Sequence, residues 1–157
     1  MLTNLRPAGP RAVLFPVDGC EPHILEAGAE PLLVGDAGTF IHEPDNAVIR
    51  AGLVAEAAGE AWLLASGVAY LTSDAPLSSP FVTDYRIREV LDLDVAGLRR
   101  WVKAARIGTL EIKCRAIDID PATLRRQLRP RGPGMATLIL ARTIRGAKAF
   151  IVERLPR

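Results

Sequence analysis

The alternation of hydrophobic and polar residues is clearest in the second half of the chain, where it predicts strands and helices in turn. Residues 81–93 and 108–117 are rich in Val, Ile, Leu and Tyr, which is typical of strands. Between these two runs, Asp94 precedes apolar residues that recur from Leu98 to Ala105 at the spacing i, i+3, i+4, i+7. This spacing predicts a helix capped by Asp94.

A second helix and a terminal hairpin follow. The pair Asp120–Pro121 is typical of a helix start, and we expect this helix to run to about Arg129. Residues 135–143 and 148–154 read as two strands joined tightly around Arg145–Gly146, which is a hairpin signal. The resulting order, β-α-β-α-β-β, predicts a sheet with helices packed on it.

The first half is less regular. We expect a strand at 11–19 with a turn at Asp18–Gly19, followed by irregular chain at 20–36 that contains short strand-like pieces. A strand at 39–42 and a helix from about Pro44 to Gly59 come next. One or two strands are expected within 61–73. Glu43 or Asp45 would cap the helix. We therefore expect an α+β protein built from two small α/β sandwich subdomains.

Composition and charge both change near residues 73–80, a stretch with two prolines and three serines. Residues 1–78 hold three basic against ten acidic side chains, whereas residues 79–157 hold seventeen basic against eight acidic. This change predicts a first domain at 1–75 and a second at 80–157. A basic second half favours an anionic partner, of which nucleic acid is the commonest, although a merely solvated surface remains an alternative.

The helix expected at 121–129 concentrates this positive charge. At about 100° per residue, Arg125, Arg126 and Arg129 share one face within about 100°, and Leu124 and Leu128 fall opposite them. No acidic side chain in the helix neutralises the arginines, and arginine favours bidentate phosphate contacts.

Other basic residues are predicted to extend this surface. The expected RNA-contacting set comprises Lys103, Arg106, Lys113, Arg115, Arg125, Arg126, Arg129, Arg131, Arg142, Arg145 and Lys148. Aromatic residues do not interleave it, so we expect recognition of RNA backbone and shape and not base stacking.

The stretch IGTLEIKCRAIDIDPATLRRQLRPRGPGMATLILAR, with the residues up to about 154, resembles the THUMP-like domain at the C-terminal end of bacterial class I S-adenosylmethionine-dependent methyltransferases. The earlier FIHEPDNAVIRAG and AYLTSD look like the ferredoxin-like segment that precedes that domain. Two positions depart from the pattern: Ala116 stands where the family usually has glycine, and Cys114 is atypical. These two departures affect only the backbone path expected near residues 114–116, and the resemblance to the family is unchanged.

The resemblance implies a non-catalytic, RNA-binding accessory region of a methyltransferase that acts on RNA such as tRNA or rRNA. It implies an upstream methyltransferase domain as partner and S-adenosylmethionine as the cofactor of the parent enzyme, with no cofactor in this chain. Two lone cysteines, Cys20 and Cys114, fit a reducing cytoplasm, and the longest apolar run, 61–71, is too short to span a membrane.

Candidate catalytic chemistry is sparse. The segment LLVGDAGTF, with Gly35 and Gly38, is the only glycine-rich candidate for a cofactor loop, and we expect an ordinary loop because a strand follows it. His23, His42 and Cys20 lack a metal-ligand spacing. Ser73 and the pair Ser78–Ser79 lack the GxSxG nucleophile turn. The alternatives to an RNA-binding module are a protein-interaction or dimerisation module and a small α/β enzyme.

Overall fold

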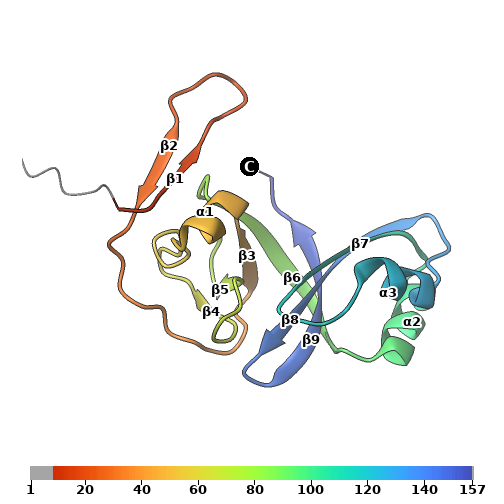
Figure 1. Cartoon of the computed structure of the whole chain (residues 1–157). Coiled ribbons are helices and arrows are strands. Elements are labelled where there is room, and N and C mark those ends of the chain that lie inside the picture. The colour runs from red at the N-terminus through yellow and green to blue at the C-terminus, as the bar shows by residue number, and fades with distance from the viewer. Residues whose placement is uncertain (1–8, 157) are drawn as a thin grey trace, which may run out of the picture.

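A computed structural model describes residues 9–156. Three helices and nine strands are assigned in this part of the chain (Figure 1). In chain order they are β1 (Arg11–Leu14), β2 (His23–Glu26), β3 (Phe40–Pro44), α1 (Asn46–Ala51), β4 (Trp62–Leu63), β5 (Leu71–Ser73), β6 (Val82–Asp92), α2 (Val95–Ala104), β7 (Ile107–Arg115), α3 (Pro121–Leu128), β8 (Gly134–Thr143) and β9 (Gly146–Arg154).

Seven of these strands form one mixed sheet in the order β4-β5-β3-β6-β9-β8-β7, and β1 pairs with β2 in a separate hairpin that projects from the body (Figure 1). The long strand β6 is central, because it pairs with β3 on one side and with β9 on the other. The α+β class is confirmed. The sheet runs without a break across the proposed boundary at 73–80, and the division into two domains stays a prediction.

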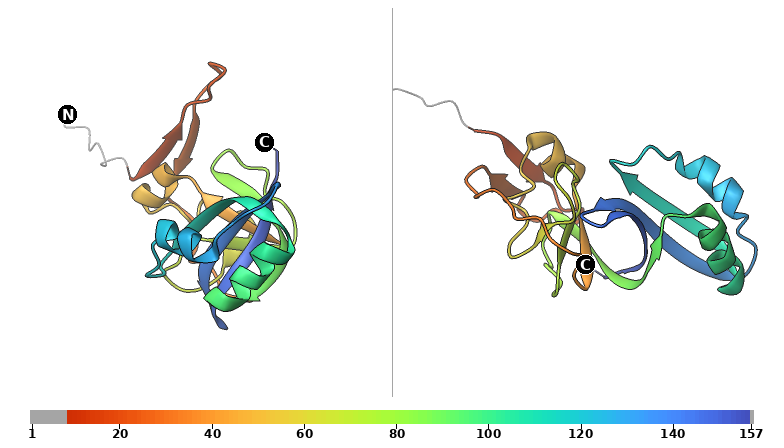
Figure 2. Two further views of the ribbon diagram at one scale, coloured as in Figure 1. Left: turned by 90° about the vertical axis from the view of Figure 1, so that its right-hand side faces the viewer. Right: turned by 90° about the horizontal axis from the view of Figure 1, so that it is seen from below.

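Strands β8 and β9 are covered on both faces. Leu138 and Leu140 of β8 pack with the buried residues of α2 and α3, whereas Ile139 and Ala141 pack with buried residues from the first half of the chain. Figure 2 shows α2 and α3 on one side of the molecule and α1 in the other lobe. The two halves therefore share a core through alternate residues of the same strands.

The helix starts of the second half confirm the sequence prediction. Asp94 accepts hydrogen bonds from the backbone N–H groups of Ala96 and Gly97, and Asp120 accepts one from Thr123. These bonds satisfy donors that a helix leaves free in its first turn.

The end of α3 differs from the prediction. The helix stops at Leu128, and Arg129 takes a left-handed conformation with φ 51° while its N–H bonds to the Arg125 carbonyl. Arg129 therefore does not share the helical face of Arg125 and Arg126, so the helical-wheel argument holds for two of the three arginines.

For the first half, one prediction was wrong and another is made more specific by the structure. The helix capped by Asp45 ends at Ala51 and not at Gly59, because Gly52 adopts φ 72° and its N–H caps the carbonyls of Val48 and Ile49. The irregular region also contains a strand, β2, which pairs antiparallel with β1. Polar residues at both ends of the four-residue HILE strand hide the apolar pattern.

The remaining elements follow the predicted order. The final hairpin pairs Thr143 with Gly146, so Ile144 and Arg145 form its two-residue loop. Strand β7 runs parallel to β8, with α3 as the crossover. Within residues 9–156, the helices are too short and too polar to span a bilayer.

Candidate functional site

The predicted RNA-contacting residues fall into two groups that differ in their partners. Four of them form ion pairs with carboxylates and are called the paired cations below: Lys113, Arg115, Arg145 and Lys148. All four lie towards the end of the sheet that carries the carboxyl ends of β7 and β8 and the β8–β9 loop.

Glu43 of β3 holds two of the paired cations. Its carboxylate lies 3.0 Å from Lys113 Nζ and 3.3 Å from a terminal nitrogen of Arg115. The Tyr85 hydroxyl donates to the same carboxylate at 3.3 Å. Because Glu43 belongs to the first half of the chain and β7 to the second, this cluster connects the two halves across the sheet.

Burial shapes the electrostatics of this cluster. Burial of the Lys113 amine acts to lower its pKa, but the hydrogen bond and the charge of Glu43 outweigh it, so the pKa lies above its usual value. Burial, followed by the negative charge of Glu43, raises the pKa of Tyr85. The guanidinium of Arg115 also lies 5.6 Å from the centre of the Tyr70 ring, a cation–π distance.

The other two paired cations are more exposed. Arg145 binds Asp36 with two hydrogen bonds of 2.5 and 2.7 Å, and this contact lowers the pKa of the Asp36 carboxyl. Lys148 pairs with Asp92 on the neighbouring strand β6, which lowers the pKa of Asp92. Arg145 thus joins the final hairpin to a loop of the first half.

Six other predicted residues are exposed and have no carboxylate within 4.0 Å among residues 9–156. We call them the helix-side cations: Lys103, Arg106, Arg125, Arg126, Arg129 and Arg131. Arg142 is also exposed and unpaired by this criterion, but it lies near the hairpin end.

Backbone contacts bring the ends of α2 and α3 together. The Arg106 carbonyl accepts a hydrogen bond from Gly134 N–H, and a side chain at Gly132 would lie 2.1 Å from the same carbonyl oxygen. Arg99 on α2 donates from Nε to the Gln127 carbonyl of α3 at 2.8 Å. The helix-side cations therefore gather around the carboxyl ends of two adjacent helices, where positive charge also stabilises the helix dipoles.

Two helix-side arginines also make local contacts. Arg125 donates from Nε to the Leu110 carbonyl at 2.9 Å, and Arg126 donates to the Thr123 hydroxyl at 2.8 Å. Each bond uses only part of a guanidinium group that has five N–H donors, so both side chains keep donors for an anion.

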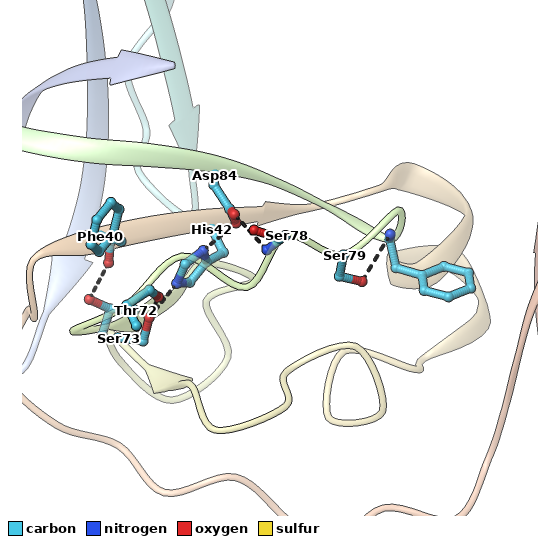
Figure 3. A network of polar contacts seen from close by, with 9 residues as sticks. Phe40, His42, Thr72, Ser73, Ser78, Ser79 and Asp84 are labelled. Carbon is cyan, nitrogen blue, oxygen red and sulfur yellow. Dashed lines mark hydrogen bonds and ion pairs between the residues drawn. The ribbon is translucent and has the colours of Figure 1, made fainter. Parts of the chain in front are cut away.

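Sequence reasoning missed a buried polar network in the first half. Figure 3 shows His42 of β3 between Asp84 of β6 and Ser73 of β5. Nδ1 of His42 lies 2.7 Å from Asp84 Oδ1, and Nε2 lies 2.7 Å from Ser73 Oγ. His42 is fully buried, and its burial lowers its pKa despite the opposing effect of Asp84. Separations of 31 and 42 residues gave no local sequence signal.

This network has the residue types of a hydrolase triad but the contacts of a structural one. Ser73 is 5% exposed, and its hydroxyl lies 2.5 Å from the Ala75 carbonyl oxygen. Asp84 also accepts a hydrogen bond from Ser78 N–H at 2.8 Å. The network therefore holds the 73–80 segment against β3 and β6.

The glycine-rich segment has a packing role. Gly35 N–H donates to the Leu63 carbonyl, and a side chain at Gly35 would lie 3.0 Å from the Trp62 ring. A side chain at Gly38 would meet the Ser73 carbonyl oxygen at 2.5 Å. Because the segment is extended and leads into β3, its residues do not fit the strand–loop–helix arrangement of an S-adenosylmethionine site.

The histidines and cysteines stay apart. His23 is exposed on β2, and Cys20 is exposed in the β1–β2 loop, whereas His42 is buried in the sheet. Cys20 and Cys114 are both free thiols. Over residues 9–156, no three His, Cys, Asp or Glu side chains converge as metal ligands.

Comparisons with known proteins identify the second half. Residues 82–154 match the THUMP domain-like family. This segment is a THUMP-like domain. The match begins at the first residue of β6 and ends at the last residue of β9, so it covers the β-α-β-α-β-β unit, and the resemblance stated from the sequence is confirmed.

The chain is also homologous to S-adenosylmethionine-dependent methyltransferases. It is 36% identical over 120 residues to two uncharacterized proteins of that description from Mycobacterium tuberculosis, strains CDC 1551 / Oshkosh and ATCC 25618 / H37Rv. The matched region is 75% of this chain and 33% of each relative. The chain thus spans about one third of the length of these relatives.

A solved structure shares the fold. The crystal structure of a "putative methyltransferase" from Porphyromonas gingivalis W83 superposes with a TM-score of 0.72 at 21% identity, covering 94% of this chain and 38% of that one. At this identity the likeness concerns the fold, and it includes the first half as well as the THUMP-like domain.

Proposed function

We propose that this chain is the RNA-binding, non-catalytic accessory region of an S-adenosylmethionine-dependent RNA methyltransferase. The observation that carries the proposal is the set of six helix-side cations, which stay exposed without carboxylate partners while four other cations of the same domain are ion-paired. The THUMP-like match and the methyltransferase relatives support the same assignment.

The chemistry of this surface favours the RNA backbone as its target. Five of the six helix-side cations are arginines, whose planar guanidinium groups bind phosphate oxygens bidentately. Trp101 is the aromatic residue of α2, and it is half-buried with its indole N–H donating to Glu89. A flat stacking platform is therefore not supplied by the helices, and we propose recognition of tRNA or rRNA by phosphate positions and shape.

Catalysis belongs, in this proposal, to a methyltransferase domain upstream in a longer protein, which binds S-adenosylmethionine. This chain supplies no cofactor loop at Gly35 and Gly38, so we expect it to transfer no methyl group by itself. Isothermal titration with S-adenosylmethionine measures this directly: we expect no binding to the chain, and micromolar affinity would contradict the proposal.

RNA binding is tested by titrating the chain with tRNA and with rRNA fragments across a salt series. Each phosphate contact releases counterions and adds roughly 0.7 to 0.9 to the log–log salt slope. We expect the Arg125→Ala, Arg126→Ala, Arg129→Ala variant to lower the slope by about two to three.

A variant with the same loss of charge controls for net charge. Arg50→Ala, Arg86→Ala, Arg154→Ala removes three exposed arginines outside the helix-side set, and like that set they have no carboxylate within 4.0 Å among the described residues. We expect this control to keep the slope of the wild type. Failure of the wild type to bind either RNA at low salt would contradict the proposed function.

A further inference from the structure

A hollow of about 710 Å³ lies in the first half of the chain, far in sequence from the helix-side cations. Apolar side chains and the Trp62 indole line it, together with four carboxylates and no basic side chain: Glu30, Asp36, Glu60 and Asp74. Glu30 and Glu60 are exposed, and no basic group lies within 4.0 Å of either among the described residues. The hollow therefore combines an apolar lining with uncompensated negative charge.

An open strand edge borders the same hollow. Gly35 N–H donates to the Leu63 carbonyl and Leu63 N–H donates to the Leu33 carbonyl, so Val34 forms a parallel bridge beyond β4. In this pattern the N–H and C=O of Val34 itself point away from β4. Within residues 9–156 they have no backbone partner, and the Leu33 and Val34 side chains are 81% and 42% exposed.

The rim already binds one guanidinium group. Arg145 reaches Asp36 from the β8–β9 loop with two hydrogen bonds, which shows that a cationic side chain fits this acidic surface. Trp62 donates from Nε1 to the Asp36 carbonyl at 2.8 Å, so the indole is fixed beside this pair.

We propose that this surface binds an extended, basic protein segment, which adds as a strand along Val34. The segment donates a backbone N–H to the Val34 carbonyl and accepts from the Val34 N–H, as in other cases of strand addition to an open edge. Its apolar side chains pack against the hollow, and its lysine or arginine side chains approach Glu30 and Glu60. The partner is thus a protein with alternating basic and apolar residues.

The probe for this proposal is a synthetic peptide, acetyl-Lys-Val-Lys-Val-Lys-Val-Lys-amide, and its Glu-for-Lys analogue is the charge control. The chain has two tryptophans, so a Trp101→Phe background makes Trp62 the sole reporter of indole fluorescence. We expect a saturable change in Trp62 fluorescence with the basic peptide and no change with the acidic one. A Trp62 signal that does not respond to the basic peptide overturns the proposal.

Two variants and one modified peptide separate the contributions. Glu30→Gln, Glu60→Gln should weaken binding about fivefold, because two surface charge contacts are each worth about 0.5 kcal/mol. Glu21→Gln, Asp118→Asn removes two exposed carboxylates outside the hollow and should leave the affinity unchanged. Equal weakening by both variants overturns the proposal, because it would report net charge alone.

Strand addition is tested without changing the protein. A peptide with N-methylated valines keeps its charges but loses backbone donors and clashes at the strand edge, so we expect it to bind at least fivefold more weakly. Full affinity of the N-methylated peptide overturns strand addition at Val34.

Discussion

The paired cations and the helix-side cations belong to one THUMP-like domain and to the same residue types, yet they have different surroundings. Lys113 and Arg115 are about one-quarter exposed and share the Glu43 carboxylate of the first half. Arg125, Arg126 and Arg129 are exposed beside two helix ends and have no carboxylate within 4.0 Å among residues 9–156.

A count of basic residues therefore overstates the size of an anion-binding surface. Glu43 and Asp36 lie at least 70 residues before the cations that they bind, and the fold brings them together across the sheet. Cations that hold two parts of a protein together are not free for an anion, so we attribute a stabilising role to the paired cations and propose RNA contact for the helix-side cations.

The largest effect on stability is expected at the buried network of His42, Asp84 and Ser73 in the first half. His42→Ala leaves the Asp84 carboxylate without its imidazole partner and opens a cavity, so we expect the free energy of unfolding to fall by about 3 kcal/mol. Urea denaturation followed by circular dichroism measures this. His23→Ala, at the exposed histidine, should change the free energy of unfolding by less than about 0.5 kcal/mol. Equal losses in the two variants would show that the network has no structural role.

The same histidine predicts a pH dependence. Burial holds the pKa of His42 in the folded chain below its usual value of 6.5. At a pH between these two values, His42 is protonated in the unfolded chain and neutral in the folded chain. The stability from neutral His42 is fully present above pH 6.5 and is lost as the pH falls through the lower folded pKa. Unfolding free energies of wild type and His42→Gln, measured from pH 7.5 to 5, should converge as the pH falls; parallel curves would contradict this.

Removal of Glu43 tests whether the paired cations contribute to stability. Glu43→Ala leaves Arg115 without its carboxylate partner and leaves Lys113 with only the exposed Glu111, and we expect a loss of about 2 kcal/mol in unfolding free energy. Glu111, which is 57% exposed and lies 3.7 Å from Lys113, offers a matched control. Glu111→Ala should cost less than about 1 kcal/mol. Similar costs for both substitutions would show that the Glu43 cluster behaves as an ordinary surface pair.

The smallest effect concerns Ala116, at the end of β7. Its φ of 55° lies in the left-handed region, which costs a residue with a side chain about 1 kcal/mol relative to glycine. Ala116→Gly should therefore raise the unfolding free energy by about 0.5 to 1 kcal/mol. Ala122→Gly in α3 should lower it by about 0.5 kcal/mol, and a loss at both positions would contradict the strain at Ala116.

Local patterns were sufficient to predict most of the second half. Asp94 and Asp120 act as the expected caps, and the Arg145 loop forms the expected hairpin turn, because caps and tight turns depend on neighbours in sequence. The end of α1 at Gly52 is not apparent in the apolar pattern, because Leu53 follows Ile49 at a helical spacing of four although it is buried outside the helix.

The candidate site was less predictable. The exposed face of Arg125 and Arg126 follows from the helical spacing of Leu124 and Leu128. The pairing of Glu43 with Lys113 and Arg115 and of His42 with Asp84 depends on strand order within the seven-stranded sheet. No local pattern in a single sequence indicates the order of strands in the sheet.

The most direct test compares the two groups of cations in one RNA-binding assay. Arg125→Ala, Arg126→Ala, Arg129→Ala and Lys113→Ala, Arg115→Ala, Arg145→Ala each remove three positive charges from the same domain. Salt series with one tRNA give the log–log slope for each variant, at a temperature where circular dichroism shows both to be folded. We expect the helix-side variant to lower the slope by about two to three and the paired variant to leave it unchanged. An unchanged slope in the helix-side variant, or an equal loss in both, would contradict the account.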